Sequence, residues 1–162
     1  MALDPVLARP TSRGRVRVNP QDRYGMPIID PRYLETQEDF DAIMDTTRFV
    51  IDAMQEYPLS GVVDFPAIPD CRACTNGSTQ CLEYIECYVR HLSRSYYNFV
   101  GTARMGLSSN PDTVVDPQFR VIGFENLRVV DASVIPRIPN AHTNAVTIAL
   151  AEMAAVIIKE SN

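Results

Sequence analysis

The chain has 162 residues, enough for one domain, and its 46% hydrophobic and 22% charged residues are ordinary for a folded protein. The formal net charge of -5 argues against nucleic acid or an anionic membrane surface as a partner of the whole molecule. No segment reaches the roughly 18 consecutive apolar residues of a membrane span. Charged residues and prolines interrupt the N-terminus, which excludes an apolar signal core there.

The first thirty residues are predicted to form a strand pair over 14–18 and 27–29, with a turn between them. Arg15 and Arg17 alternate with valines, and this period of two places successive side chains on opposite faces of a strand. We therefore interpret the arginines clustered in this region as the solvated face of a strand pair.

A long helix is predicted next, with Thr36 as its N-cap and an end near Tyr57. Its apolar side chains recur at intervals of three and four, so one face is expected to pack on a core. These residues are Phe40, Ile43, Met44, Thr47, Val50, Ile51 and Met54. A loop over 58–80 then leads to a second amphipathic helix. Its apolar stripe contains Cys81, Tyr84, Ile85, Tyr88 and Leu92.

The four cysteines, at positions 71, 74, 81 and 87, leave three interpretations open. The C-x-x-C spacing of the first two is found in zinc sites, but the other two form no second pair of this kind. One or two disulfides between the loop 68–80 and the second helix are favoured over zinc and suit an oxidising compartment. Free buried thiols are the third alternative. His91 is interpreted as a partly exposed or structurally bonded residue.

After position 114 a short strand pair is predicted over 114–117 and 119–122, followed by a buried strand over 127–130. The last helix is predicted over 145–159 and is apolar almost all round. Such a helix is expected to be buried against a sheet larger than this chain can build.

Three polar residues, His142, Thr143 and Asn144, precede this last helix. The first turn of a helix offers N–H groups without acceptors and a partial positive charge, which suit an anion or an electron-rich ring edge. The alternative is simple capping by Thr143 or Asn144, with His142 as a bystander. From these residues alone both interpretations stay open.

The order and spacing of several motifs resemble the C-terminal region of the glucose-methanol-choline (GMC) family of flavin oxidoreductases. The principal segments are 96–106, 126–133 and 138–145, with further similarity at 9–15, 29–33 and 115–117. The second helix is also similar to that of the insect members. The resemblance implies the cofactor FAD and the oxidation of a CH–OH group of a small-molecule alcohol or sugar, with hydride passing to flavin N5.

The fold implied by the resemblance is α+β. Residues 1–118 would form the substrate-binding part, an antiparallel sheet with flanking helices. Residues 119–162 would add a strand and a helix that complete a Rossmann-like FAD domain. The family's N-terminal G-x-G-x-x-G fingerprint has no counterpart among the seven glycines of this chain. We therefore expect this chain to be the C-terminal part of a longer protein that carries the FAD-binding domain. The alternative is a truncated gene product that binds FAD poorly alone.

Carried over to this sequence, the family's catalytic positions are Asn98 and His142, and its cofactor-binding positions are Asp131, Ala132, Thr143 and Asn144. The family has a histidine at the first catalytic position, whereas an amide cannot take up a proton. Loss of a general base removes about 10²–10⁴-fold in rate. Either His142 serves as the base while Asn98 positions the alkoxide, which we favour, or the chain is a catalytically impaired, non-enzymatic homologue. The cysteines and the insect-type resemblance favour an extracellular location.

Overall fold

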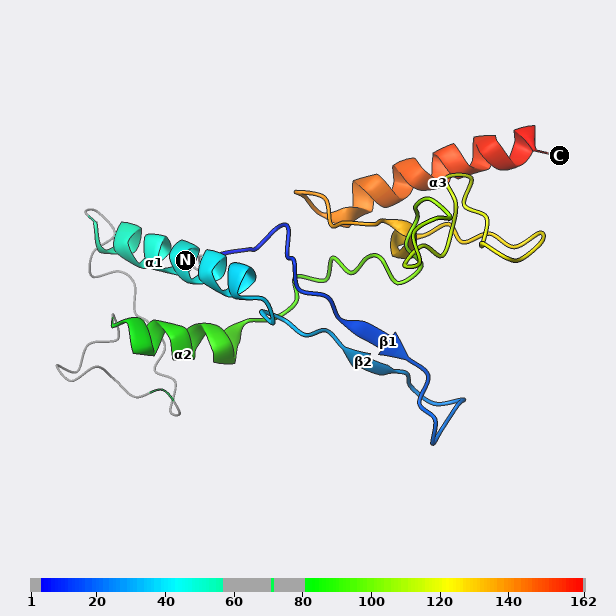
Figure 1. Cartoon of the computed structure of the whole chain (residues 1–162). Helices are drawn as coiled ribbons and strands as arrows, with labels where there is room; N and C mark the ends of the chain where they lie inside the picture. The colour runs from blue at the N-terminus through cyan, green and yellow to red at the C-terminus, as the bar shows by residue number, and fades with distance from the viewer. Residues whose placement is uncertain (1–3, 57–70, 72–80, 162) are drawn as a thin grey trace. The chain divides into compact units, whose positions relative to one another are not determined.

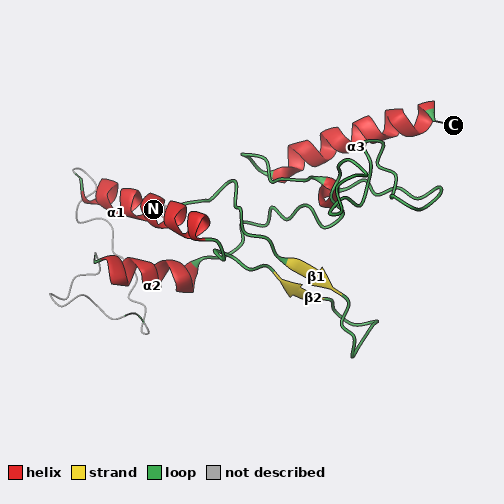
Figure 2. Ribbon diagram, in the orientation of Figure 1, coloured by secondary structure: helices red, strands yellow, loops and turns green. Residues whose placement is uncertain are grey.

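We describe residues 4–56, 71 and 81–161 of a computed structural model of the chain (Figure 1). Their elements are a two-stranded antiparallel sheet, three α-helices and a short 3-10 helix, which confirms the α+β class (Figure 2). The chain divides into two compact units. Unit 1 comprises residues 1–14 and 31–95, and unit 2 comprises residues 15–30 and 96–162.

In unit 1 the first helix, α1, covers Gln37–Gln55, and its N-cap is Thr36 as predicted. The Thr36 side chain accepts a hydrogen bond from the backbone N–H of Asp39 at 3.4 Å. The helix ends with Glu56 as its C-cap, close to the predicted end. The predicted loop over 58–80 lies outside the described residues except for Cys71.

The second helix, α2, covers Leu82–Leu92, and it packs against α1. The shared core consists of Phe40, Ile43, Met44, Ile51, Ile85 and Val89. The guanidinium of Arg90 also lies 4.1 Å from the centre of the Phe40 ring, a cation–π contact between the two helices. The predicted stripe is right for Tyr84 and Ile85 but wrong for Leu92, which is 46% exposed. Leu92 is the last residue of α2, and Val89 provides the core contact of that turn instead.

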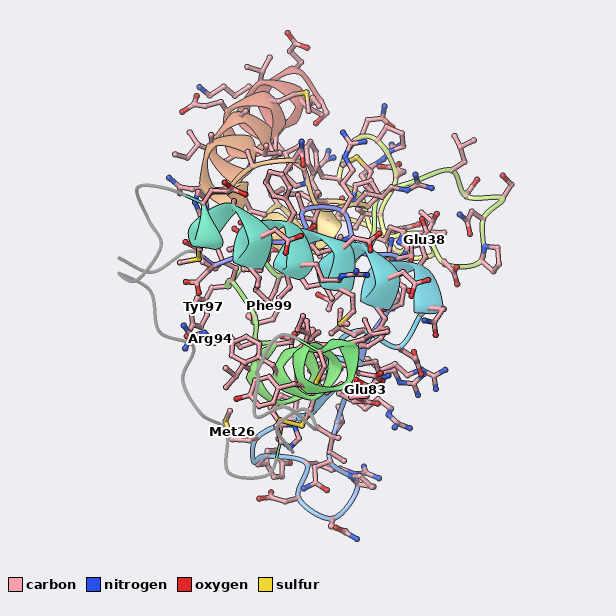
Figure 3. The ribbon with its side chains drawn as sticks, turned by 90° about the vertical axis from the view of Figure 1, so that its left-hand side faces the viewer. Met26, Glu38, Glu83, Arg94, Tyr97 and Phe99 are labelled. Carbon is pink, nitrogen blue, oxygen red and sulfur yellow. A yellow bond between two sulfur atoms is a disulfide. The ribbon has the colours of Figure 1, made fainter. Side chains whose placement is uncertain are left out.

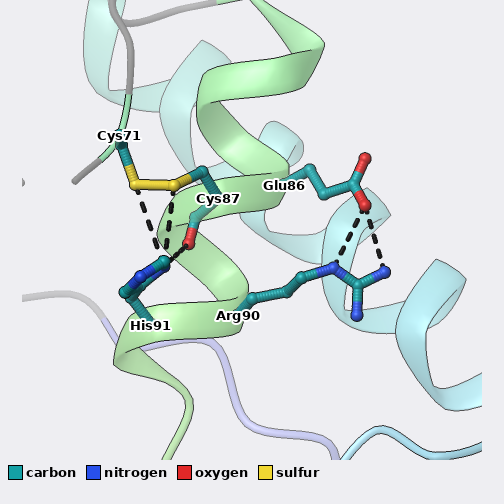
Figure 4. The surroundings of a disulfide bond; sticks show 5 residues. All are labelled: Cys71, Glu86, Cys87, Arg90 and His91. Atoms are coloured by element: carbon teal, nitrogen blue, oxygen red, sulfur yellow. Dashed lines mark hydrogen bonds and ion pairs between the residues drawn. A yellow bond between two sulfur atoms is a disulfide. The ribbon is translucent and has the colours of Figure 1, made fainter.

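A disulfide between Cys71 and Cys87 joins the loop before α2 to the helix itself (Figure 4). Cys81 is disulfide-bonded as well. The predicted disulfides are therefore confirmed, and the zinc and free-thiol interpretations are wrong for these three cysteines because their sulfur atoms are bonded to other sulfurs. His91 Nδ1–H donates to the Cys87 carbonyl at 2.9 Å, which confirms the structural interpretation of this residue.

A buried carboxylate, that of Asp39, fixes the N-terminal segment to α1. It is only 2% exposed, and it accepts hydrogen bonds from the N–H groups of Thr11 and Ser12, each at 2.7 Å. The Thr11 hydroxyl donates a third at 2.9 Å. Burial raises the pKa of Asp39, but the hydrogen bonds from Ser12 and Thr11 outweigh this effect and lower the pKa from 3.8 to about 2.

The Asp39→Asn variant is expected to be less stable near neutral pH by roughly 2 kcal/mol, because one pKa unit corresponds to about 1.4 kcal/mol. The unfolded carboxyl titrates near 3.8, so this stabilisation is complete above that pH and is lost as the pH falls toward 2. Urea unfolding of both proteins across the acid range measures the difference. Asp41→Asn, an exposed position on the same helix, is the control. Equal stability of Asp39→Asn and wild type near neutral pH would contradict the prediction.

In unit 2 the predicted strand pair is confirmed as β1 (Arg15–Arg17) and β2 (Ile28–Asp30), with Val16 opposite Ile29 in antiparallel register. The arginines of β1 are exposed, as expected for a solvated face. Val16 and Ile29 are at least half exposed too, so neither face of this hairpin is covered within the described residues.

The segment 103–135 folds around a small core in which Val115, Phe119, Val134 and Ala154 are almost completely buried. The strands predicted over 114–122 occur as single bridges, including an antiparallel one between Val115 and Val121. The strand predicted over 127–130 is wrong as a regular element, since its described pairing is one bridge from Arg128 to Arg120. A strand needs a continuous partner for its backbone groups, and the described residues supply only a short one.

The last helix, α3, covers Thr143–Glu160, so it begins two residues earlier than predicted. Ala154 is buried, whereas Ile148, Met153 and Val156 are each about half exposed. The described residues thus leave much of this apolar helix uncovered, and its burial against a larger sheet stays a prediction. None of the helices in the described ranges is long and apolar enough to cross a bilayer.

Candidate active site

Asn98 and the start of α3 are joined by two hydrogen bonds. The Asn98 Oδ1 atom accepts from the backbone N–H of Thr143 at 3.2 Å and from the Thr143 hydroxyl at 3.3 Å. His142 is the residue immediately before Thr143 and is the N-cap of the helix. The structure therefore joins Asn98, across 45 positions of sequence, to the residue that follows His142, the other member of the predicted catalytic pair.

Asn98 performs the capping that was predicted for Thr143 or Asn144. The first N–H groups of a helix lack acceptors within it, and a side-chain oxygen usually supplies one. The side chain of the N-cap residue, His142, makes no such bond. Because the amide of Asn98 supplies the acceptor from another segment, the helix begins at Thr143 and the imidazole is not used for capping.

The imidazole of His142 stacks on the ring of Tyr96. The ring centroids are 5.6 Å apart and the planes are inclined by 25°. His142 is exposed, and Tyr96 is 54% exposed. Two more aromatic residues of this segment, Tyr97 and Phe99, are largely exposed (Figure 3). The sequence did not single out Tyr96, although a contact from residue 98 to α3 places residue 96 within reach of the same helix end.

Backbone contacts hold the segment after Asn98 against the 3-10 helix η1, Ala132–Val134. The N–H of Ala103 donates to the Ser133 carbonyl at 3.0 Å, and the N–H of Met105 donates to the Val134 carbonyl at 2.9 Å. Gly101 has a φ of +84°, and a Cβ there would lie 3.3 Å from the carbonyl oxygen of Ile135. Glycine is therefore required both for the left-handed backbone and for the close approach.

Asp131 is the N-cap of η1, and one of its oxygens accepts from the N–H of Ser133 at 2.7 Å. Asp131 is exposed, so its other carboxylate oxygen is accessible, and Ala132 is half-buried. No hydrogen bond in the described part of the chain joins Asp131 or Ala132 to Asn98 or His142. They are connected to Asn98 through the backbone contacts between the two segments.

The residues predicted to bind the cofactor fit a flavin in chemical terms. The N–H of Thr143 is taken by Asn98, but the N–H groups of Asn144 and Ala145 lie in the first turn, where no acceptor exists within the helix. Together with the positive end of the helix dipole they suit the electron-rich pyrimidine edge of a flavin. The accessible oxygen of Asp131 suits a hydroxyl donor such as that of a ribityl chain.

Residues 10–151 match the family model of GMC oxidoreductases, C-terminal region. The chain belongs to the GMC oxidoreductase family. This confirms the resemblance seen in the sequence motifs. Oxidoreductase activity and the use of a flavin cofactor are properties of this family.

Relatives of this GMC chain include human mitochondrial choline dehydrogenase, which is 40% identical over 157 residues, 93% of this chain and 24% of the relative. Similar solved structures include a fungal aryl-alcohol oxidase, with a TM-score of 0.76 at 31% identity over 96% of this chain and 24% of the other. A formate oxidase of Aspergillus oryzae RIB40 has a TM-score of 0.78 at 30% identity, covering 96% and 26% of the two chains. The GMC chain thus spans about a quarter of the length of these proteins.

Proposed function

We propose that this GMC chain is the C-terminal part of an FAD-dependent oxidoreductase that acts on CH–OH groups of an alcohol or sugar. The observation that supports the proposal is the pair of hydrogen bonds from Thr143 to Asn98, beside His142. Asn98 thus binds the first residue of the helix, and His142 is the residue just before it, so the two members of the pair flank one helix end. The substrate is a small molecule.

In this proposal His142 takes the hydroxyl proton of the substrate. Its imidazole is exposed and unused by capping, and a neutral imidazole accepts a proton readily at physiological pH. The Oδ1 atom of Asn98 is committed to Thr143, so the amide nitrogen of Asn98 is left to donate a hydrogen bond to the substrate oxygen. Donation to the oxygen stabilises the negative charge that develops as the proton leaves.

FAD, when bound, would accept the hydride from the carbinol carbon at N5. The residues of this chain that would hold it are Asp131, Ala132, Thr143 and Asn144. Asp131 and Ala132 would contact the phosphate–ribityl region. The first turn of α3, with Thr143 and Asn144, would face the pyrimidine edge.

The remaining cofactor contacts are proposed to come from an N-terminal FAD-binding domain of the same protein. The half-exposed apolar side chains Ile148, Met153 and Val156 of α3 support this partner, because their burial against it would remove apolar surface from water. Residues 1–118 would then form the substrate-binding part, and residues 119–162 would contribute to the FAD site.

We also propose an extracellular location. The disulfide between Cys71 and Cys87 supports it, since disulfides persist in oxidising compartments. The insect-type resemblance of α2 is a further argument in the same direction.

The proposal is tested on the full-length flavoprotein that carries this chain. The purified protein is expected to show a flavin absorption spectrum and to reduce a redox dye when supplied with members of a panel of alcohols and sugars. Bound flavin without reduction by any of them would favour the alternative, a catalytically impaired homologue with a non-enzymatic role. A protein that binds no flavin would overturn the proposal.

A further inference from the structure

Residues 96 and 98 both contact the start of α3, but at different atoms. Asn98 binds the backbone N–H and the hydroxyl of Thr143, and Tyr96 lies against the imidazole of His142. The helix end is thus held by its backbone, and the one side chain proposed to transfer a proton is held separately by an aromatic ring.

The imidazole needs such a contact because nothing else described restrains it. An N-cap side chain usually has its rotamer fixed by its own hydrogen bond to the helix, and His142 makes none. An exposed side chain without a fixed partner distributes among staggered rotamers. Stacked aromatic pairs favour one arrangement by a factor of roughly 2 to 13 beyond the effect of burial.

We propose that Tyr96 is a positioning residue that holds the His142 imidazole in the orientation used for proton transfer. The inference rests on the proposed function of His142 as the base. The ring, and not the hydroxyl, carries the effect, since the contact is a stack of two ring planes. Phenylalanine at position 96 should therefore preserve the function, and leucine should not.

The stack itself is tested by proton NMR of the 162-residue chain, which contains only two histidines, His91 and His142. The His91→Gln variant assigns the two sets of imidazole signals. The ring current of Tyr96 is expected to shift the His142 signals upfield. Tyr96→Leu should remove this shift and Tyr96→Phe should keep it. His142 signals that do not move in Tyr96→Leu would overturn the proposal, whatever the enzyme activity.

The positioning role is tested by the rate of flavin reduction in the full-length flavoprotein. Tyr96→Leu is expected to lower the limiting rate by about 10- to 100-fold with little change in KM, because misplacing a reacting group by about 1 Å can cost as much as 100-fold. Tyr96→Phe should restore the wild-type rate. Tyr24→Leu, which removes a fully exposed tyrosine of the β1–β2 hairpin, is the matched control.

The two measurements separate failure of this inference from failure of the proposed function. Loss of the ring-current shift without loss of rate in Tyr96→Leu would show that the stack exists but does not position the base, which overturns the inference alone. An inactive wild-type flavoprotein would overturn the proposed function, and the NMR result would still decide whether Tyr96 holds His142.

Discussion

Replacement of His142 by glutamine is expected to lower the rate of flavin reduction by substrate about 10²–10⁴-fold, the contribution of a positioned general base. Glutamine is similar in size and can still form hydrogen bonds, but it cannot take up a proton. Since His142 is exposed and makes no capping bond, the change should leave α3 intact. Rapid-mixing measurement of flavin reduction in the full-length flavoprotein gives the rate directly.

His91→Gln is the matched control for this substitution. His91 is the other histidine of the chain, and its imidazole donates to the carbonyl of Cys87 on α2. The control variant should reduce its flavin at the wild-type rate. A His142→Gln variant that keeps the wild-type rate would show that the base is supplied by another residue, and the assignment of roles in the pair would then be wrong.

The helices and the disulfides of this chain could be predicted because their signals are local. Thr36 marks the start of α1 by its hydroxyl, and the spacing of apolar residues marks the buried faces of α1 and α2. The cysteine positions limited the cross-links to a few, of which Cys71–Cys87 is one. None of these features needs a partner far away in the sequence to be recognised.

Two features could not be predicted because they depend on partners that the local sequence does not name. The segment 127–130 is rich in β-branched residues, but it makes a single bridge because the described residues offer it no continuous strand. The start of α3 was misplaced because its capping oxygen comes from Asn98, 45 residues earlier. The family motifs predicted Asn98 and His142 as a pair, whereas the capping bond and the Tyr96 stack are seen only in the structure.

The cap bond also changes what is expected of position 98. Asn98→Ala removes the acceptor for Thr143 and should cost about 1 kcal/mol of stability, the usual value for a lost N-cap. Asn98→Asp keeps an acceptor at the positive end of the helix but loses the amide donor. If that donor stabilises the substrate oxygen, Asn98→Asp should be stable and yet much slower in flavin reduction.

Asn98→His is expected to raise the rate of flavin reduction by about 10²-fold, because it restores a proton acceptor at the position where GMC proteins carry histidine. A neutral imidazole has one acceptor nitrogen, so a ring that takes up the substrate proton cannot also accept from the N–H of Thr143, and the variant should lose the cap as Asn98→Ala does. The comparison of these variants by unfolding and by flavin reduction separates the two roles of the side chain. A rate in Asn98→His as low as in Asn98→Ala, with stability unchanged, would mean that the amide is a working part of this site. His142 would then act as the base and Asn98 would position the substrate oxygen, as the favoured interpretation of the sequence expects.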